Sequence, residues 1–268
     1  MPEIENPRLW RLSLELSARA MHVVLSSMVS DSTLHQYSVP INPANGYLKG
    51  LEDAVYASPE VLGDYGHVDL LVESQAYVPV PTELSDEEAI ACAAHAQLTD
   101  NEELSKIFVD RSDVASLAWT MPEELASFLA RTFRNAPVHL HITPLIKYLH
   151  KRASLGNSAK LFAHLGAETV DIISFSADGK LNIAATHRIE SDADAAYYIL
   201  ACAVESGLDL ANDEIQLCGD SQRRHSVMPL VAKYAARVMP LIFPSAALRA
   251  GREAFKAPFP LIIVPLCE

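Results

Sequence analysis

A chain of 268 residues, half of them hydrophobic, is long enough to bury a sizeable core, which argues against an intrinsically disordered protein. Its formal charge of −13 is unevenly shared, because residues 1–150 carry 21 of the 34 acidic side chains and 9 of the 21 basic ones. A surface this acidic repels a phosphate backbone, so we expect no nucleic acid as a partner.

Membrane insertion is not expected either. The longest apolar run, 259–267, is far shorter than the roughly 20 residues of a membrane span, and two prolines interrupt it. Residues 1–11 contain two glutamates and two prolines, unlike the basic and apolar stretches of a signal peptide. The four cysteines show no paired spacing and are expected to be reduced, buried thiols: Cys92, Cys202, Cys218 and Cys267. These features predict a cytoplasmic protein.

The first predicted elements are three strands, a helix and a fourth strand. Leu12, Leu14 and Leu16 alternate with polar residues, which is typical of a half-buried strand. Further strands are expected over 21–28, 33–41 and 67–73, with a helix over 44–57.

The second half repeats this order at an offset of roughly 150 residues, without residue-level identity. Strands are predicted over 160–165, 169–175, 181–189 and 214–218. A helix begins at the capping box of Ser191 and Asp194 and ends at Gly207. Two tandem lobes of similar construction follow from this pattern.

The segments outside the two repeats are mixed. We expect a helix from Ser85 to about 96, a hairpin of 107–110 with 115–120, a strand over 138–142, and helices from Pro122 and Pro144. After the second repeat come a helix from Ser221, a strand over 238–243 and a helix from Ser245. Gly156 and Asn157 mark the lobe boundary, which gives a first lobe of 1–153, with an inserted section of about 85–152, and a second lobe of 154–268.

Three segments carry a family resemblance: 77–84 followed by acidic 86–88, 119–125, and 141–145. On these segments the chain resembles an uncharacterised bacterial family with an actin-like ATPase fold, domain of unknown function 3822, and more distantly the PilM pilus-assembly proteins. The resemblance implies an α/β fold of two tandem ribonuclease H-like lobes in an actin-like ATPase arrangement. The cofactor of that fold is ATP with Mg²⁺, so its loops can be tested one by one.

The first two phosphate loops lack parts that ATP needs. An active loop places an acid, glycines and small hydroxyl residues at the first hairpin, because backbone N–H groups must approach the phosphates. Here that hairpin offers Ser17 and Arg19 but no glycine, and Glu15 is expected at the edge of exposure. The second hairpin keeps Gly166 and Thr169, but His164 stands where an aspartate would hold the metal's water shell.

The third loop, which backs the adenine, matches best. Gly219 allows a close approach, and Asp220 or Ser221 can cap the helix that follows. An ordinary strand-to-helix turn needs the same residues for structural reasons alone.

No catalytic residue and no metal site are predicted. His139 with His141, and Cys92 with His95, are spaced as metal-binding pairs, yet neither pair has an identifiable third ligand. The chain contains no Gly-x-Ser-x-Gly elbow, Walker loop or dinucleotide fingerprint.

The leading hypothesis is therefore a degenerate actin-like protein that does not turn over ATP and acts on an unknown protein partner. Two alternatives stay open: an ATP-binding or ATP-gated protein that uses Ser17, Thr169 and Gly219, and a module that binds a small molecule or peptide between the lobes. The oligomeric state also stays open. In every case the hairpins at 17–20 and 165–168 should face one another across a cleft.

Overall fold

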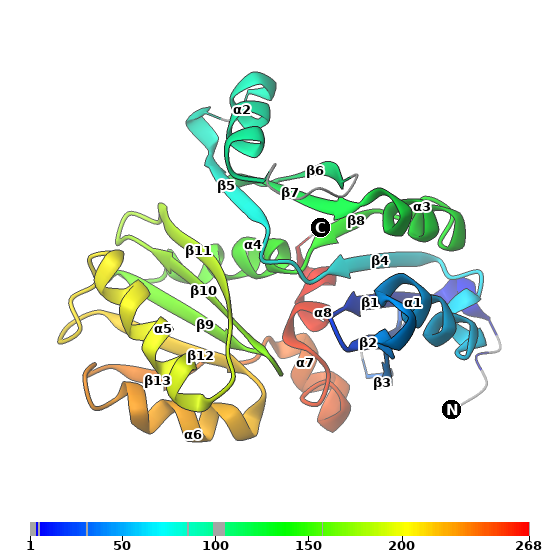
Figure 1. The fold of residues 1–268 in the computed structure, drawn as a ribbon. Coiled ribbons are helices and arrows are strands. Elements are labelled where there is room, and N and C mark those ends of the chain that lie inside the picture. Colours follow the sequence, from blue (N-terminus) through cyan, green and yellow to red (C-terminus); the bar gives the residue numbers. More distant parts are fainter. Residues whose placement is uncertain are drawn as a thin grey trace.

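A computed structural model describes residues 4, 6–30, 32–84, 86–98, 105–156 and 158–267. Two lobes lie side by side, and a smaller sheet projects from the first (Figure 1). The strands are β1 (Trp10–Leu16), β2 (Ala20–Ser27), β3 (Leu34–Pro40), β4 (His67–Val72), β5 (Tyr77–Pro81), β6 (Ser105–Arg111), β7 (Ala115–Pro122), β8 (Val138–Leu140), β9 (Lys160–Leu165), β10 (Thr169–Phe175), β11 (Leu181–Arg188), β12 (Glu214–Gly219) and β13 (Val238–Pro240). The helices are α1 (Tyr47–Tyr56), α2 (Glu87–Leu98), α3 (Glu123–Thr132), α4 (Ile142–Ala153), α5 (Asp192–Glu205), α6 (Ser221–Val231), α7 (Ser245–Ala250) and α8 (Phe259–Ile263).

The two large sheets have the same strand order. The first is β3-β2-β1-β4-β8 and the second is β11-β10-β9-β12-β13. In each, three antiparallel strands are followed by two parallel ones that arrive through helical crossovers. This is the repeated order that the sequence predicted, and it brings the turn between β1 and β2 and the turn between β9 and β10 to equivalent places in their lobes.

One apolar core fills the first lobe and continues into the second through Phe162, Ile173 and Phe175, and another core lies within the second lobe. Alternating leucines of β1 pack with α1 and with the third sheet, whose order is β5-β7-β6. In the second lobe, β9 and β10 pack against α5 and α6. The predicted capping box of Ser191 and Asp194 opens α5, and Gly207 follows its end with a positive φ of 73°.

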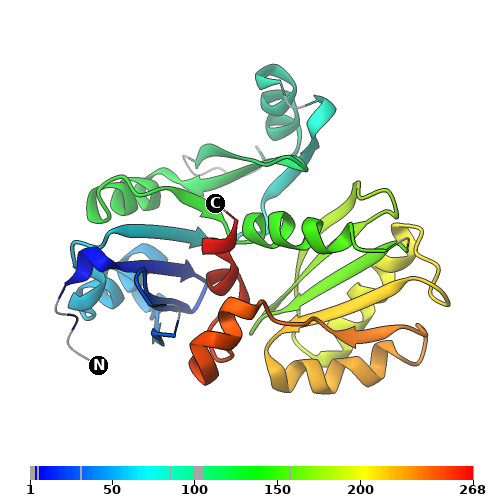
Figure 2. The ribbon, with the colours of Figure 1, turned by 180° about the vertical axis from the view of Figure 1, so that it is seen from behind.

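The C-terminal segment returns to the first lobe. Side chains of α7 and α8 and of the turn between them pack on Val24 and Leu71, on the second face of the first sheet. Figure 2 shows from behind that α8 lies between the two lobes. The division of the chain at residue 153 stays a proposal. In the structure, the segment 245–266 contacts strands of the first lobe.

Three local predictions were wrong. The strand expected over 138–142 ends at Leu140, and α4 begins at Ile142 instead of Pro144. The last strand ends at Pro240 instead of 243, and β5, which contains two prolines, was not predicted. The expected cap Ser85 lies outside the described residues. The four cysteines are free thiols, as predicted, but only Cys202 and Cys218 are buried: Cys92 is exposed and Cys267 is partly buried.

Candidate functional site

The two hairpins of interest meet between the lobes. Arg19, in the β1–β2 turn, forms an ion pair with Glu168, in the β9–β10 turn, with 2.8 Å between Nε and Oε1. The expectation that these hairpins face one another is confirmed by this contact. A charged pair, made by the protein itself, joins the loops that an actin-like ATPase would place around phosphates.

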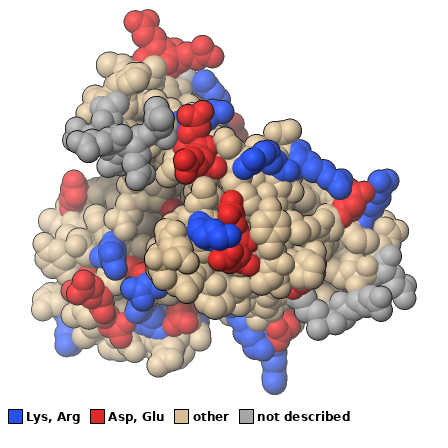
Figure 3. Space-filling view, turned by 45° about the vertical axis from the view of Figure 1, so that its right-hand side comes forward, with Lys and Arg blue, Asp and Glu red and all other residues tan. Residues whose placement is uncertain are grey.

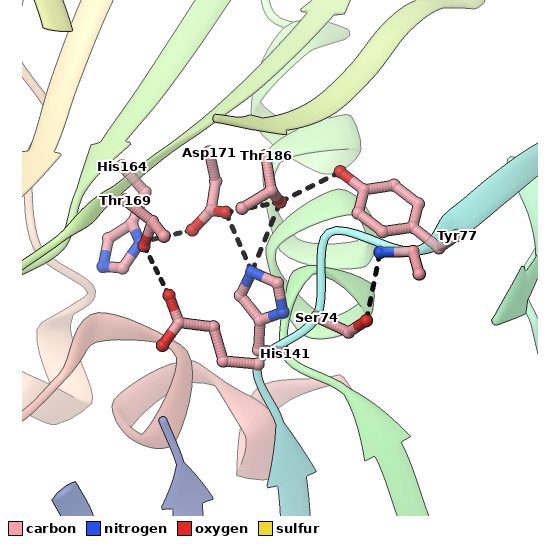
Figure 4. Close-up of polar contacts among 9 residues, drawn as sticks. Ser74, Tyr77, His141, His164, Thr169, Asp171 and Thr186 are labelled. Carbon is pink, nitrogen blue, oxygen red and sulfur yellow. Dashed lines mark hydrogen bonds and ion pairs between the residues drawn. The ribbon is translucent and has the colours of Figure 1, made fainter. Parts of the chain in front are cut away.

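Two further polar contacts link the lobes. Glu73, which directly follows β4, accepts a hydrogen bond from the hydroxyl of Thr169, at the start of β10, at 2.6 Å. Tyr77 on β5 and Thr186 on β11 have their hydroxyl oxygens 3.0 Å apart. Figure 4 shows Tyr77, Thr169 and Thr186 within one group of polar side chains.

A buried ion pair lies at the centre of this arrangement. His141 directly precedes α4, and its Nε2 lies 2.8 Å from Oδ1 of Asp171 on β10. Asp171 also binds Nδ1 of His164 at 2.8 Å and the hydroxyl of Thr186 at 2.8 Å. Both members of the central pair are about 1% exposed, so this lobe contact is removed from water.

The strand register explains how Asp171 gathers its partners. His164 on β9 and Thr186 on β11 are the residues directly opposite Asp171 on the two neighbouring strands. Directly opposite residues on antiparallel strands point to the same face, so the three polar side chains form one row. His141 approaches this row from the first lobe and completes the network.

Charge in the network favours a protonated His141 and an ionised Asp171. Burial by itself lowers the pKa of His141, but Asp171, with smaller contributions from Glu73 and Glu15, raises that pKa to about 9. Burial pushes the pKa of Asp171 upward, while His141 and His164 together hold it well below its ordinary value. The pair is therefore ionic at neutral pH.

The sequence suggested that Glu15 is just exposed, which was wrong: its side chain is buried, with 6% of the residue exposed. Glu15 and Arg11 alternate with the leucines of β1 and point to the other face of the strand, and every residue from Arg11 to Leu16 is buried. Burial raises the pKa of Glu15 to about 7, against the opposing charges of His164 and His141. No hydrogen bond or ion pair among the described residues involves its carboxyl.

The predicted third loop packs against the second hairpin. Gly219 has φ +89°, and a Cβ there would lie 2.2 Å from the carbonyl oxygen of Leu165. Asp220 donates its backbone N–H to that same oxygen at 2.8 Å, and its side chain caps α6 through the N–H of Arg223. Ser221 is the exposed first residue of α6. A close approach between β9 and the end of β12 accounts for this glycine.

The remaining predicted residues are engaged within the protein. Ser17 closes its own turn, since its hydroxyl bonds both the carbonyl and the N–H of Ala20. The guanidinium of Arg223 donates to the carbonyl oxygens of Gly166 and Ala167 at 3.0 and 2.8 Å. All seven candidates thus lie in or beside three turns. The β1–β2 turn contacts the β9–β10 turn, which in turn packs on the turn between β12 and α6.

These donors do not fit a nucleoside triphosphate with Mg²⁺. Phosphate needs free N–H groups and cations, whereas Ser17 and Thr169 are already bonded and Arg19 is neutralised by Glu168. Glu73 and the partly ionised Glu15 add negative charge to the same region, whereas the charge of Asp171 is matched by His141. A second anion there would be repelled.

His139 and His141, one of the two pairs that the sequence offered as metal ligands, bind different partners in the structure. His139 binds Asp110, with 2.9 Å between Nδ1 and Oδ1, while His141 binds Asp171 in the other lobe. Across the residues that the structure describes, no group of three or more His, Cys, Asp or Glu side chains is arranged to hold a metal ion.

The sequence contained a signal for this network that loop reasoning missed. Asp171 stands in a mainly apolar strand, and an aspartate is rarely buried without a partner. His141 and Glu73 follow the ends of neighbouring parallel strands, β8 and β4, and therefore reach the same edge of the first sheet. No sequence pattern indicated that this edge faces Asp171.

Other surface features lie away from the lobe contact. A cavity of about 260 Å³ is lined by 61–68 and 132–137, and Asp64 at its wall pairs with Arg8 and Arg134. On the face in Figure 3, acidic and basic side chains are interspersed, and acidic ones gather at the upper end, where α2 lies. Among the described residues, no helix is both long and apolar enough to span a bilayer.

Solved structures with the same architecture define the class of fold. A protein of unknown function with an actin-like ATPase fold, from Bacteroides thetaiotaomicron VPI-5482, matches with a TM-score of 0.79 at 19% identity, over 90% of this chain and 94% of that one. The PilM-PilN type IV pilus biogenesis complex matches with a TM-score of 0.54 at 13% identity, over 97% and 98%. This protein therefore has the two-lobed actin-like ATPase fold, as predicted.

The family is equally clear. The family described as "Protein of unknown function (DUF3822)" matches residues 3–238, so the chain belongs to it, and the resemblance seen in the sequence is confirmed. None of the curated proteins matches the chain.

Proposed function

We propose that this protein is a degenerate member of the actin-like fold that does not turn over ATP and acts through protein–protein contacts in the cytoplasm. One observation carries the proposal: the protein's own polar contacts join the hairpins that would hold phosphate to the opposite lobe. The Arg19–Glu168 and Thr169–Glu73 contacts use the side chains that would otherwise be available to phosphate.

Electrostatics supports the same conclusion. A buried His141–Asp171 pair and the carboxyl of Glu15 lie beside these contacts, in a chain of net charge −13. The two charges of the His141–Asp171 pair are matched within the protein, so this pair offers no free positive charge to a phosphate. A fold kept without its phosphate chemistry is suited to presenting surfaces. The PilM-PilN complex, whose matching chain has this fold, is a protein–protein assembly.

Titration calorimetry with ATP, ADP and GTP, each with Mg²⁺, tests the proposal. We expect no binding heat up to about 1 mM nucleotide, which corresponds to less than about 4 kcal/mol of binding free energy. Phosphate release should equal that of a Ser17→Ala, Thr169→Val double variant, because neither hydroxyl contacts a phosphate in this proposal.

Hydrolysis that the double variant abolishes would overturn the proposal and support an ATPase. Submillimolar binding without hydrolysis would support the ATP-gated alternative instead.

A further inference from the structure

Helix α5 is apolar on two faces, although only one of them is buried. Its inner face packs into the second core through Ala195, Ala196, Ile199, Cys202 and Ala203. The outer stripe, defined as Ala193, Tyr197, Ala201 and Val204, repeats at intervals of three and four residues on the opposite side and is exposed. A helix that is apolar all round is normally buried on all sides, so the outer stripe calls for a partner.

The aromatic residue of the outer stripe has a fixed neighbour. Tyr197 is 67% exposed, and its ring contacts that of Tyr198 edge to face, with 5.4 Å between centroids. Tyr198 in turn stacks on His187 of β11 at 4.3 Å. An exposed aromatic ring that rests on a stacked pair loses little side-chain entropy on binding. Tyrosine is also among the residue types that contribute most to binding energy at interfaces. In Figure 1, α5 lies on the outside of the second lobe with no described element over it.

The segment that carries the outer stripe is acidic. Residues 190–209 contain five acidic residues and no Lys or Arg. Asp192 pairs with Arg223, and Asp194 closes the capping box. The other three, which are exposed, are Glu190 before the helix and Glu205 and Asp209 at and beyond its end.

We propose that the outer α5 stripe docks an amphipathic helix of another protein, whose apolar face is flanked by Lys and Arg. This deepens, and rests on, the proposed function by naming the surface and the chemistry of the partner. A second copy of this chain fits poorly, because antiparallel pairing of two α5 helices would bring Glu190 against the partner's Glu205, both acidic. A basic helix satisfies both the apolar stripe and its acidic ends.

A defined probe tests this surface: a fluorescent helical peptide of leucine and lysine at amphipathic spacing, with a leucine and glutamate peptide as its counterpart. Fluorescence anisotropy on the full chain should show binding of the basic peptide. The affinity for the acidic peptide should be at least about tenfold weaker. Val204→Lys, which adds a positive charge to the stripe, should weaken basic-peptide binding about tenfold or more, and Tyr197→Gln should weaken it without a charge change. Val29→Lys is the matched control, since Val29 is 72% exposed in a first-lobe turn and Val204 is 66% exposed.

The outcomes separate this inference from the proposed function. Equal binding of both peptides, an equal effect of Val29→Lys, or a dimer in sedimentation that Val204→Lys abolishes would each overturn the docking of a basic helix. Circular dichroism melts confirm that the variants fold, which is expected because both side chains are exposed. If ATP is hydrolysed while the peptide still binds the outer stripe, the proposed function fails and this surface stands.

Discussion

Glu15 gives the sharpest test of the buried network, because burial penalises only its charged form. Its pKa rises from an ordinary 4.5 to about 7 in the folded protein. A raised pKa means that the associated stability is present below pH 4.5 and is lost as the pH rises through 7. By linkage, the full loss of unfolding free energy is about 3 kcal/mol. The loss is nearly complete at pH 8 and amounts to about 1 kcal/mol at pH 5.

Glu15→Gln removes the charge and keeps the shape of the protonated acid. We therefore expect the free energy of unfolding to rise by about 3 kcal/mol at pH 8 and by about 1 kcal/mol at pH 5. Urea unfolding at both values, followed by the fluorescence of fully buried Trp119, measures the difference. The exposed Glu124→Gln should change stability by less than about 0.5 kcal/mol at either pH.

A gain that is equal at the two pH values, or a loss at pH 8, would refute the reasoning. In the first case the side chain would act through packing alone, and in the second its carboxylate would have a partner that stabilises the charge.

The other predictions concern the same lobe contact. Asp171→Asn should destabilise the protein by about 3–5 kcal/mol in urea unfolding at pH 7, because His141 loses its counter-charge; a change below about 1 kcal/mol would contradict a buried ionic pair. Gly219→Ala should cost more than about 1 kcal/mol, since the new Cβ collides with the backbone of Leu165 at a positive φ, and an unchanged melting temperature would exclude that packing. Arg19→Ala should cost less than about 1 kcal/mol in thermal melts because its ion pair is exposed, and a larger loss would mean that the pair is shielded from water.

The strand order could be predicted from the sequence because core burial dictates it residue by residue. Alternating leucines in β1 and mainly apolar segments in β9 and β10 indicated these strands, and the elements of each lobe follow one another along the chain in the predicted order. Two boundaries failed for identifiable reasons. Ile142 continues the period-two pattern of Val138 and Leu140, yet it begins a helix that accommodates Pro144 in its first turn.

Strand β5 was missed because Pro79 and Pro81 argue against a central strand. It lies at an edge of the third sheet, where proline is tolerated.

The candidate site was only half predictable. Sequence order placed Arg19 and Glu168 in facing hairpins, since two similarly built lobes bring their first turns together. It did not reveal the ion pair of His141 and Asp171, which depends on how one lobe is oriented on the other. The buried aspartate in an apolar strand was visible beforehand, but its counter-charge comes from an element of the other lobe.

The path of the chain between the sheets has a mechanical consequence. The polypeptide leaves the first sheet at Leu140 and returns from the second at Pro240, so two crossings connect the lobes. Two fixed points define an axis, and rotation about it is the easiest relative motion left to two rigid bodies. His141 lies on the first crossing, where such a rotation moves atoms least. If the lobes open, the His141–Asp171 pair therefore lies near the rotation axis and is kept, while Arg19 separates from Glu168 first.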